Sequence, residues 1–109
     1  MKKIRPSLRE KKRYLVYEVV SDNTFNYGTV SKAILDESER FLGRLGMANA
    51  GIMILEDWDG RRGLLKVNNK YIDHIKATLT FINKIEDRKV MVKSVGVSGM
   101  INKAKERCL

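Results

Sequence analysis

The stretch that decides the fold is residues 51–67, GIMILEDWDGRRGLLKV. Its first part, residues 51–56, is rich in the aliphatic side chains typical of a strand, and residues 63–67 form a second short apolar run. Between them stands Asp57-Trp58-Asp59-Gly60, and an Asp-Gly pair between two apolar runs is a strong hairpin signal. The segment therefore predicts two adjacent antiparallel strands in the middle of the chain.

On the N-terminal side of this hairpin, the sequence predicts one strand and one helix. Residues 13–20, RYLVYEVV, are mostly β-branched and aromatic, as expected of a strand. From Thr29 the apolar period becomes helical, with Thr29 or Asn26 as the N-cap and Gly46 where a C-terminal cap is expected. The predicted buried stripe of this helix is Val30, Ile34, Phe41, Leu42 and Leu45.

On the C-terminal side, a second helix, a fourth strand and a short final helix are predicted. Asn68 or Asn69 would cap the second helix, and Asp87-Arg88 would turn the chain into a strand over residues 89–97. Ser98 is expected to open the final helix, which runs to Cys108. The apolar face of the second helix is predicted to be Ile72, Ile75, Leu79, Ile82 and Ile85.

The resulting order, β-α-β-β-α-β and a terminal helix, is the split βαβ or ferredoxin-like pattern of an α+β domain. Right-handed crossovers would place both long helices on one face of a four-stranded antiparallel sheet. The other face is expected to stay open or to be partly covered by the terminal helix. We expect a protein partner at this face or at a helix edge beside it. Residues 1–12 are predicted to form a basic tail, and residues 13–109 a single domain.

Composition restricts the class of protein further. The chain has 109 residues, of which 43% are hydrophobic, enough for one domain with a modest core. The single cysteine, Cys108, cannot form a disulfide within the chain, so we expect a reducing, cytoplasmic environment. No segment approaches the ~18 uninterrupted apolar residues of a membrane span, and no membrane partner is expected.

Positive charge is concentrated at the N-terminus, where residues 1–13 carry +6 of the net charge of +9. A field this dense attracts a polyanion, whose binding releases counterions. The alternative is a tail that only keeps the protein in solution. The basic side chains of this stretch that are predicted to contact RNA are Lys2, Lys3, Arg5, Arg9, Lys11, Lys12 and Arg13.

A second candidate site is the run Gly96-Val97-Ser98-Gly99, which is predicted to turn from the last strand into the final helix. Small residues let another backbone approach closely, and the first amides of a helix can hold a phosphate. The simpler alternative is that Ser98 is only an N-cap.

The remaining candidates do not point to catalysis. Tyr14 and Tyr17 stand three apart and so point to opposite faces of a strand, which leaves no platform for stacking bases. His74 is expected to be solvated, and Asp57 and Asp59 to favour the turn. Trp58 is either an exposed contact at the hairpin tip or is folded back on the sheet. We expect no catalytic residue, no metal site and no cofactor bound by the chain.

Three segments of the chain, taken in order, resemble one known family. They are RYLVYE at residues 13–18, GLLKV at 63–67 with KYI at 70–72, and GVSGMI at 96–101 followed by Lys103-Ala104. Their order and spacing are similar to protein component 2 of archaeal ribonuclease P over about residues 11–107. Met100 stands where the family more often has threonine, and the N-terminal tail is longer and more basic than in the family.

The resemblance implies a subunit of the ribonucleoprotein that removes the 5′ leader of precursor tRNA. In this family the RNA subunit, with magnesium, performs the chemistry. The protein pairs with a barrel-fold protein subunit, often in a heterotetramer with two copies of each. The RNA-facing residues that the resemblance implies are Arg13, Lys66, Lys70 and Lys103, with Gly96, Ser98 and Gly99 shaping the loop between them.

Two other functions remain open from the residues themselves. The first is a free-standing RNA-binding or ribosomal-type protein, which would need no protein partner. The second is a ligand-sensing regulatory domain, since the same topology serves in such proteins. The net charge of +9 argues against the second function.

Overall fold

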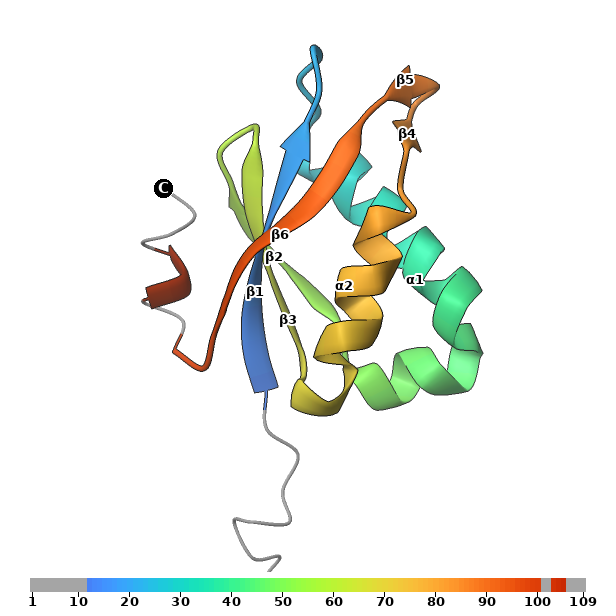
Figure 1. The fold of residues 1–109 in the computed structure, drawn as a ribbon, viewed down its shortest axis with the longest axis vertical. Coiled ribbons are helices and arrows are strands. Elements are labelled where there is room, and N and C mark those ends of the chain that lie inside the picture. Colours follow the sequence, from blue (N-terminus) through green and yellow to red (C-terminus); the bar gives the residue numbers. More distant parts are fainter. Residues whose placement is uncertain (1–11, 101–102, 106–109) are drawn as a thin grey trace, which may run out of the picture.

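A four-stranded antiparallel sheet forms the centre of the molecule in the computed structural model, which describes residues 12–100 and 103–105. The sheet has the order β2-β3-β1-β6. Two helices, α1 and α2, lie together on one side of it (Figure 1). The strands are β1 (Lys12–Val20), β2 (Met53–Trp58), β3 (Arg62–Asn68) and β6 (Met91–Ser98), and the helices are α1 (Tyr27–Ala50) and α2 (Ile72–Thr80). The predicted ferredoxin-like α+β fold is confirmed.

The core lies between the sheet and the helices, and the two-residue period of β1 determines which side chains enter it. Leu15, Tyr17 and Val19 face the helices and are buried in the main apolar cluster. Tyr14 and Val16 belong to a smaller cluster on the opposite face. The two tyrosines therefore point to opposite faces, as their spacing predicts.

The ends of α1 are capped by polar and glycine residues of the expected kinds. Asn26 is the N-cap, and its side chain accepts a hydrogen bond of 2.8 Å from the backbone N of Thr29. The C-cap is Gly51 in the left-handed region (φ 57°), whereas Gly46 was predicted to end the helix. The helix is therefore one turn longer than its apolar period suggested.

A break inside α1 changes which residues are buried. At Gly43 the backbone leaves the helical region (φ 70°, ψ 176°), so the second part of the helix runs in a different direction. Phe41 and Leu45 were expected in the core, but they are 49% and 77% exposed. Ser38 is buried instead, and its hydroxyl donates to the carbonyl of Ile34 at 2.7 Å.

The second helix is shorter than predicted. Asn68 caps a 3₁₀ turn, η2 (Asn69–Tyr71), which leads directly into α2. α2 has only nine residues, so α1 alone is a long helix. Ile82 and Ile85 are buried as expected, but they lie beyond the end of the helix. These two residues are therefore buried by the path of the loop that follows α2, and they are not part of a helical apolar stripe.

That loop contains a small hairpin that the sequence analysis did not predict. It consists of β4 (Lys84–Ile85) paired with β5 (Arg88–Lys89). Between them Glu86 and Asp87 both have positive φ, 53° and 62°, as a tight two-residue hairpin turn requires. The turn lies at Glu86-Asp87, one residue before the predicted Asp87-Arg88, since Arg88 is the first residue of β5, and β6 starts only at Met91.

The boundaries of the other strands differ from the predicted boundaries by one or two residues. β2 begins and ends two residues later than predicted, so Trp58 is its last residue and not part of the turn. Lys12 is the first residue of β1, although it was assigned to the tail. The register between β1 and β6 shifts at Val16, where Gly96 and Ser94 pair with consecutive residues and Val95 is the extra residue of a bulge.

The sheet face opposite the helices is partly covered by the end of the chain. Ala104 is buried there against Val16 and Leu64, and its backbone N donates to the carbonyl of Met100 at 3.1 Å. Helical residues are described at 103–105, and the predicted extension to Cys108 lies outside the described residues. Within the described residues, no helix is long and apolar enough to cross a membrane.

Candidate nucleic-acid interface

Four of the basic residues predicted from the sequence lie together at one end of the sheet. β1 begins at this end, and β3 and β6 finish there (Figure 1). In register, Tyr14 pairs with Lys66 on one side and with Ser98 on the other, and Arg13 pairs with Val67. Residues that are more than 80 positions apart in sequence thus share one edge of the molecule. We call this group, Lys12, Arg13, Lys66 and Lys70, the basic end.

Gly99 lies directly beside Arg13 at the basic end. A Cβ atom placed on Gly99 would be 2.8 Å from Nη1 of Arg13, closer than two such atoms can pack. The glycine therefore leaves the space that the guanidinium occupies. The sequence predicted that Gly99 lets a ligand approach, and the structure shows that it makes room for an arginine.

The run of small residues at 96–99 is mainly strand and not turn, in contrast to the prediction. Gly96 pairs with Val16, and Ser98 is the last residue of β6. Only Gly99 and Met100 form the bend that follows. The hydroxyl of Ser98 accepts from the backbone N of Met100 and donates to its carbonyl, both at 3.1 Å, so this side chain shapes the bend.

Lys12 has a local structural role as well as a charge. A Cβ atom on Gly51 would lie 2.5 Å from Nζ of Lys12, so the ammonium group sits at the C-terminal end of α1. The C-terminus of a helix carries partial negative charge and favours a cation there. The end of α1 therefore favours the ammonium group of Lys12 at this place.

Lys70 is exposed on η2, and its backbone is held by Asn68, which is buried. The side chain of Asn68 accepts a hydrogen bond of 3.0 Å from the backbone N of Lys70 and donates to the carbonyl of Asn49 at 3.4 Å. This amide joins β3, η2 and the end of α1. The sequence indicated Asn68 only as a possible cap, because its contact with α1 is non-local.

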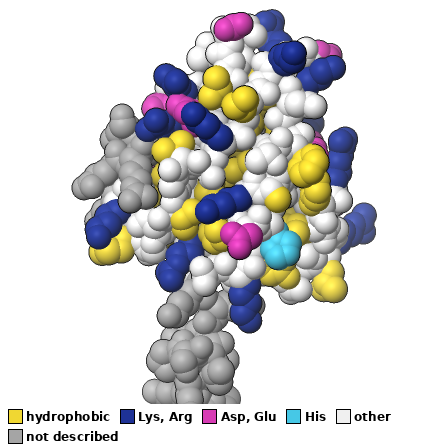
Figure 2. All heavy atoms as spheres, viewed as in Figure 1, with side chains coloured by type: hydrophobic (Ala, Val, Ile, Leu, Met, Phe, Trp, Pro, Cys, Tyr) yellow, Lys and Arg dark blue, Asp and Glu magenta, His cyan; other side chains and the backbone are white. Residues whose placement is uncertain are grey.

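The other predicted RNA-binding residues are less well placed by the structure. Lys103 is exposed next to the buried Ala104, beside the sheet face opposite the helices. Five predicted contacts lie outside the described residues, namely Lys2, Lys3, Arg5, Arg9 and Lys11. In Figure 2, Lys and Arg side chains outnumber acidic ones on the visible face and flank the lower end of the domain.

A buried carboxylate with several cations around it was missed by the sequence analysis. Glu18 is 2% exposed, on the sheet face opposite the helices. Its Oε2 atom lies 2.8 Å from Nε of Arg61 and 3.3 Å from Nε of Arg62, and its Oε1 atom is 3.3 Å from Nζ of Lys93. The only sequence signal was an acid inside an apolar strand, because Arg62 and Lys93 come from other strands and Arg61 from the hairpin turn.

These contacts keep Glu18 charged despite its burial. Burial by itself raises the pKa of this carboxyl group, but the hydrogen bonds from Lys93 and Arg62 and the charges of Arg61 and Arg62 act in the opposite direction. The net effect is a pKa below the ordinary value of 4.5. One negative charge is thus held among several positive ones, and the group keeps a net positive charge.

The residues considered for other chemistry have structural roles. Oδ1 of Asp59 accepts hydrogen bonds from two backbone N–H groups of the hairpin turn, at 2.8 and 2.6 Å. Trp58 is folded back, since its Nε1 donates to the carbonyl of Phe25 at 2.9 Å and its ring stacks on Tyr17. His74 is exposed, as expected. Across residues 12–100 and 103–105, no group of three or more metal-ligating side chains occurs.

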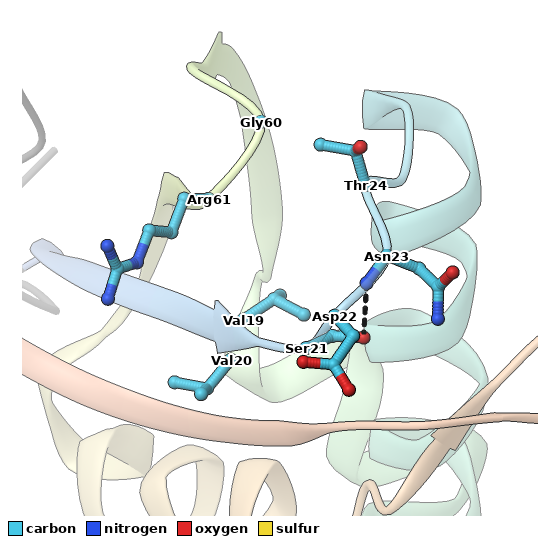
Figure 3. A pocket seen from close by; sticks show the side chains of 8 residues that line it. All are labelled: Val19, Val20, Ser21, Asp22, Asn23, Thr24, Gly60 and Arg61. Atoms are coloured by element: carbon cyan, nitrogen blue, oxygen red, sulfur yellow. Dashed lines mark hydrogen bonds between the residues drawn. The ribbon is translucent and has the colours of Figure 1, made fainter.

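The other end of the sheet carries an open hollow of about 390 Å³ (Figure 3). It is formed where β1 leads into the loop before α1, and the side chain of Arg61 turns away from it and toward β1. Asn23 donates from its backbone N to the hydroxyl of Ser21 at 3.1 Å, which closes the loop on itself. The polar groups there serve the loop, and we assign no ligand to this hollow.

Together these features define a basic, ferredoxin-like α+β domain whose described part contains no catalytic cluster. Residues 13–109 match the model of the Rpp14/Pop5 family. Ribonuclease P protein component 2 of Pyrococcus furiosus is 33% identical over 109 residues, covering 99% of this chain and 91% of the relative. The protein of the same name from Methanosarcina acetivorans is 27% identical over 109 residues, covering 100% of this chain and 82% of the relative.

The chain therefore belongs to the Rpp14/Pop5 family, and the resemblance seen in the sequence is confirmed. A chain in the cryo-EM structure of yeast ribonuclease MRP has the same fold, with a TM-score of 0.68 at 11% identity. That match covers 90% of this chain and 86% of the other chain.

Proposed function

We propose that this chain acts in ribonuclease P as a protein subunit that holds the RNA through the basic end of its sheet. Membership of the family makes it a component of that enzyme with no catalytic residues of its own. The observation that supports contact with RNA is that Lys12, Arg13, Lys66 and Lys70 lie together at one end of the sheet. The cleavage chemistry, and the magnesium that it needs, we assign to the RNA subunit.

The basic end suits a phosphate backbone because its cations are not paired with acidic side chains. Within the described residues, none of its four cations forms an ion pair with an acidic side chain. Lysine and arginine that contact phosphates release counterions, so this surface supports binding that is strong and salt-dependent. Residues 1–11 join the domain at Lys12 and would add their own charges at the same end.

The protein partner is proposed to dock on the helix layer. Phe41 and Phe81 are 49% and 58% exposed, and their ring centroids are only 4.8 Å apart. Leu45 is 77% exposed on the same helix as Phe41, after the break at Gly43. Exposed aromatic side chains that already pack together are typical anchors of a protein interface. We propose the barrel-fold subunit of ribonuclease P as the occupant, in an assembly with two copies of each protein.

The two alternative functions have less support. A free-standing RNA-binding protein would not need the aromatic pair on its helix layer. A ligand-sensing domain would need an enclosed apolar pocket, whereas the hollow at the loop before α1 is open and lined largely by polar residues. We place the protein in the cytoplasm as part of the same proposal, in keeping with its single cysteine.

The test is cleavage of precursor tRNA by ribonuclease P RNA reconstituted with its protein subunits. The double variant Lys66→Gln, Lys70→Gln should require several-fold more protein for half-maximal cleavage. The matched control is Arg88→Gln, Lys89→Gln, which removes the same charge from exposed positions on β5, away from both the basic end and the helix layer. The protein without RNA should cleave nothing. Equal effects of the two double variants would contradict the proposed surface.

A further inference from the structure

We propose that Arg61 and Lys93, positioned by the buried Glu18, form a second phosphate-binding site for RNA on the sheet face opposite the helices. The proposal rests on the proposed function, because it assumes that the chain binds RNA. It concerns residues toward the other end of the sheet, near the hairpin turn between β2 and β3, that are separate from the basic end. Arg62 shares the contact with Glu18 and helps to hold it in place.

The site is built by strand register and by a tight turn. Glu18 on β1 pairs directly with Arg62 on β3 and with Lys93 on β6, so the three side chains form one row across the sheet. Arg61 joins them from the hairpin turn, where its carbonyl accepts a hydrogen bond of 2.8 Å from the backbone N of Val19. Both the strands and the turn therefore fix the positions of these cations.

The arrangement leaves binding capacity on its outer side. The carboxylate lies beneath the surface with its side chain 3% exposed, whereas the side chains of Arg61 and Lys93 are 70% and 55% exposed. Arg61 meets Glu18 through Nε, which leaves the two terminal nitrogens of the guanidinium farther out. A phosphate is bound well by such a planar fork, and an ammonium beside it adds a second charge.

The buried acid lowers the cost of binding. Long cationic side chains normally lose rotamer freedom when they bind a ligand, and this loss of conformational entropy weakens binding. Here the contacts with Glu18 have already restricted them. One negative charge among three positive ones leaves a net charge of +2, so the group still attracts an anion.

The second site is distant enough from the basic end to contact a different part of the RNA. From Lys12 to Glu18 the strand rises about 20 Å, at about 3.3 Å per residue. Between the two lie Val16 and Leu64, which are covered by Ala104. An extended polyanion can reach both groups of cations, whereas a single phosphate cannot.

The first experiment measures the salt dependence of binding between the full-length protein and a transcribed archaeal ribonuclease P RNA. The double variant Arg61→Gln, Lys93→Gln should lower the slope of log K against log salt by about 0.7–0.9, the value expected for one phosphate that is no longer neutralised. The matched control is Lys32→Gln, Arg40→Gln, because Arg40 is also exposed and also ion-paired, with Glu37. The control should change the slope by far less.

A second measurement does not depend on the folding of any variant. The wild-type protein is acetylated with and without the RNA, and the modification of each lysine is followed by mass spectrometry. Lys93 should be protected by RNA at least threefold more than Lys32. If RNA binds and neither the slope nor the protection distinguishes the two regions, this second site is refuted while the proposed function stands. If no RNA binds, both fail.

Discussion

The contact between Gly99 and Arg13 allows one substitution to separate RNA binding from folding. In Gly99→Val the new Cβ would lie 2.8 Å from Nη1 of Arg13, so the guanidinium must move. The backbone of Gly99 lies outside the left-handed region, so valine is sterically allowed there. The displaced group is the end of a flexible side chain, and a change of its rotamer costs on the order of 1 kcal/mol or less.

The expected loss is larger for RNA than for stability. A hydrogen bond between arginine and a phosphate contributes about 1.5–3 kcal/mol, and here the group is moved and not removed. We therefore expect the lower end of that range, which is about a tenfold increase in Kd for ribonuclease P RNA. Filter binding and reconstituted cleavage measure this effect. A melting curve should shift by no more than about 4–8 °C for a domain of this size.

A double-mutant cycle shows whether Arg13 carries the effect. If it does, Gly99→Val should add almost nothing in an Arg13→Ala background. A tenfold loss that persists in that background would refute the reasoning, and so would wild-type binding by Gly99→Val alone. A variant that does not fold would show that the glycine serves the structure and not the RNA.

Three further predictions concern other parts of the molecule. Deleting residues 1–11 should lower the salt slope of RNA binding by about 0.7–0.9 for each phosphate that these residues neutralise, and an unchanged slope would show that they neutralise none. The lowered pKa of Glu18 contributes stability that is full above its unfolded value, near 4.5, and is lost as the pH falls through the lower folded value. Glu18→Gln should therefore flatten the acid side of a plot of unfolding free energy against pH, and an unchanged plot would contradict this. Phe41→Ser should abolish capture of the barrel-fold subunit with little effect on melting, whereas Met91→Ser, at a similarly exposed position on the sheet, should leave capture intact.

The order of elements was predictable because it depends on local patterns. The strand at β1, the hairpin of β2 and β3, and the cap at Asn26 all follow from neighbouring residues. The wrong predictions of buried residues arose where tertiary structure overrides the helical period of the apolar residues. Leu45 is exposed because it follows the break at Gly43, and the burial of Ile85 came from a small hairpin that resembles a helical repeat in sequence.

The candidate site was predictable in its residue types but not in its geometry. Basic residues at positions 13, 66 and 70 were identified, yet only strand register shows that they share one end of the sheet. The group around Glu18 could not be found, because its cations lie 43 to 75 positions away in sequence and meet it only across paired strands.

The central place of β1 affects how the protein can be made in the cell. Its partner β6 is separated from it by 71 to 84 residues, since Val20 pairs with Met91 and Tyr14 with Ser98. Closing a loop of that length is entropically costly until its contacts form, so the sheet cannot be completed early in synthesis. The last strand must leave the ribosome before β1 has both neighbours. Because Ser98 ends that strand and Gly99 follows it beside Arg13, the growing chain completes the basic end only when the sheet itself is closed.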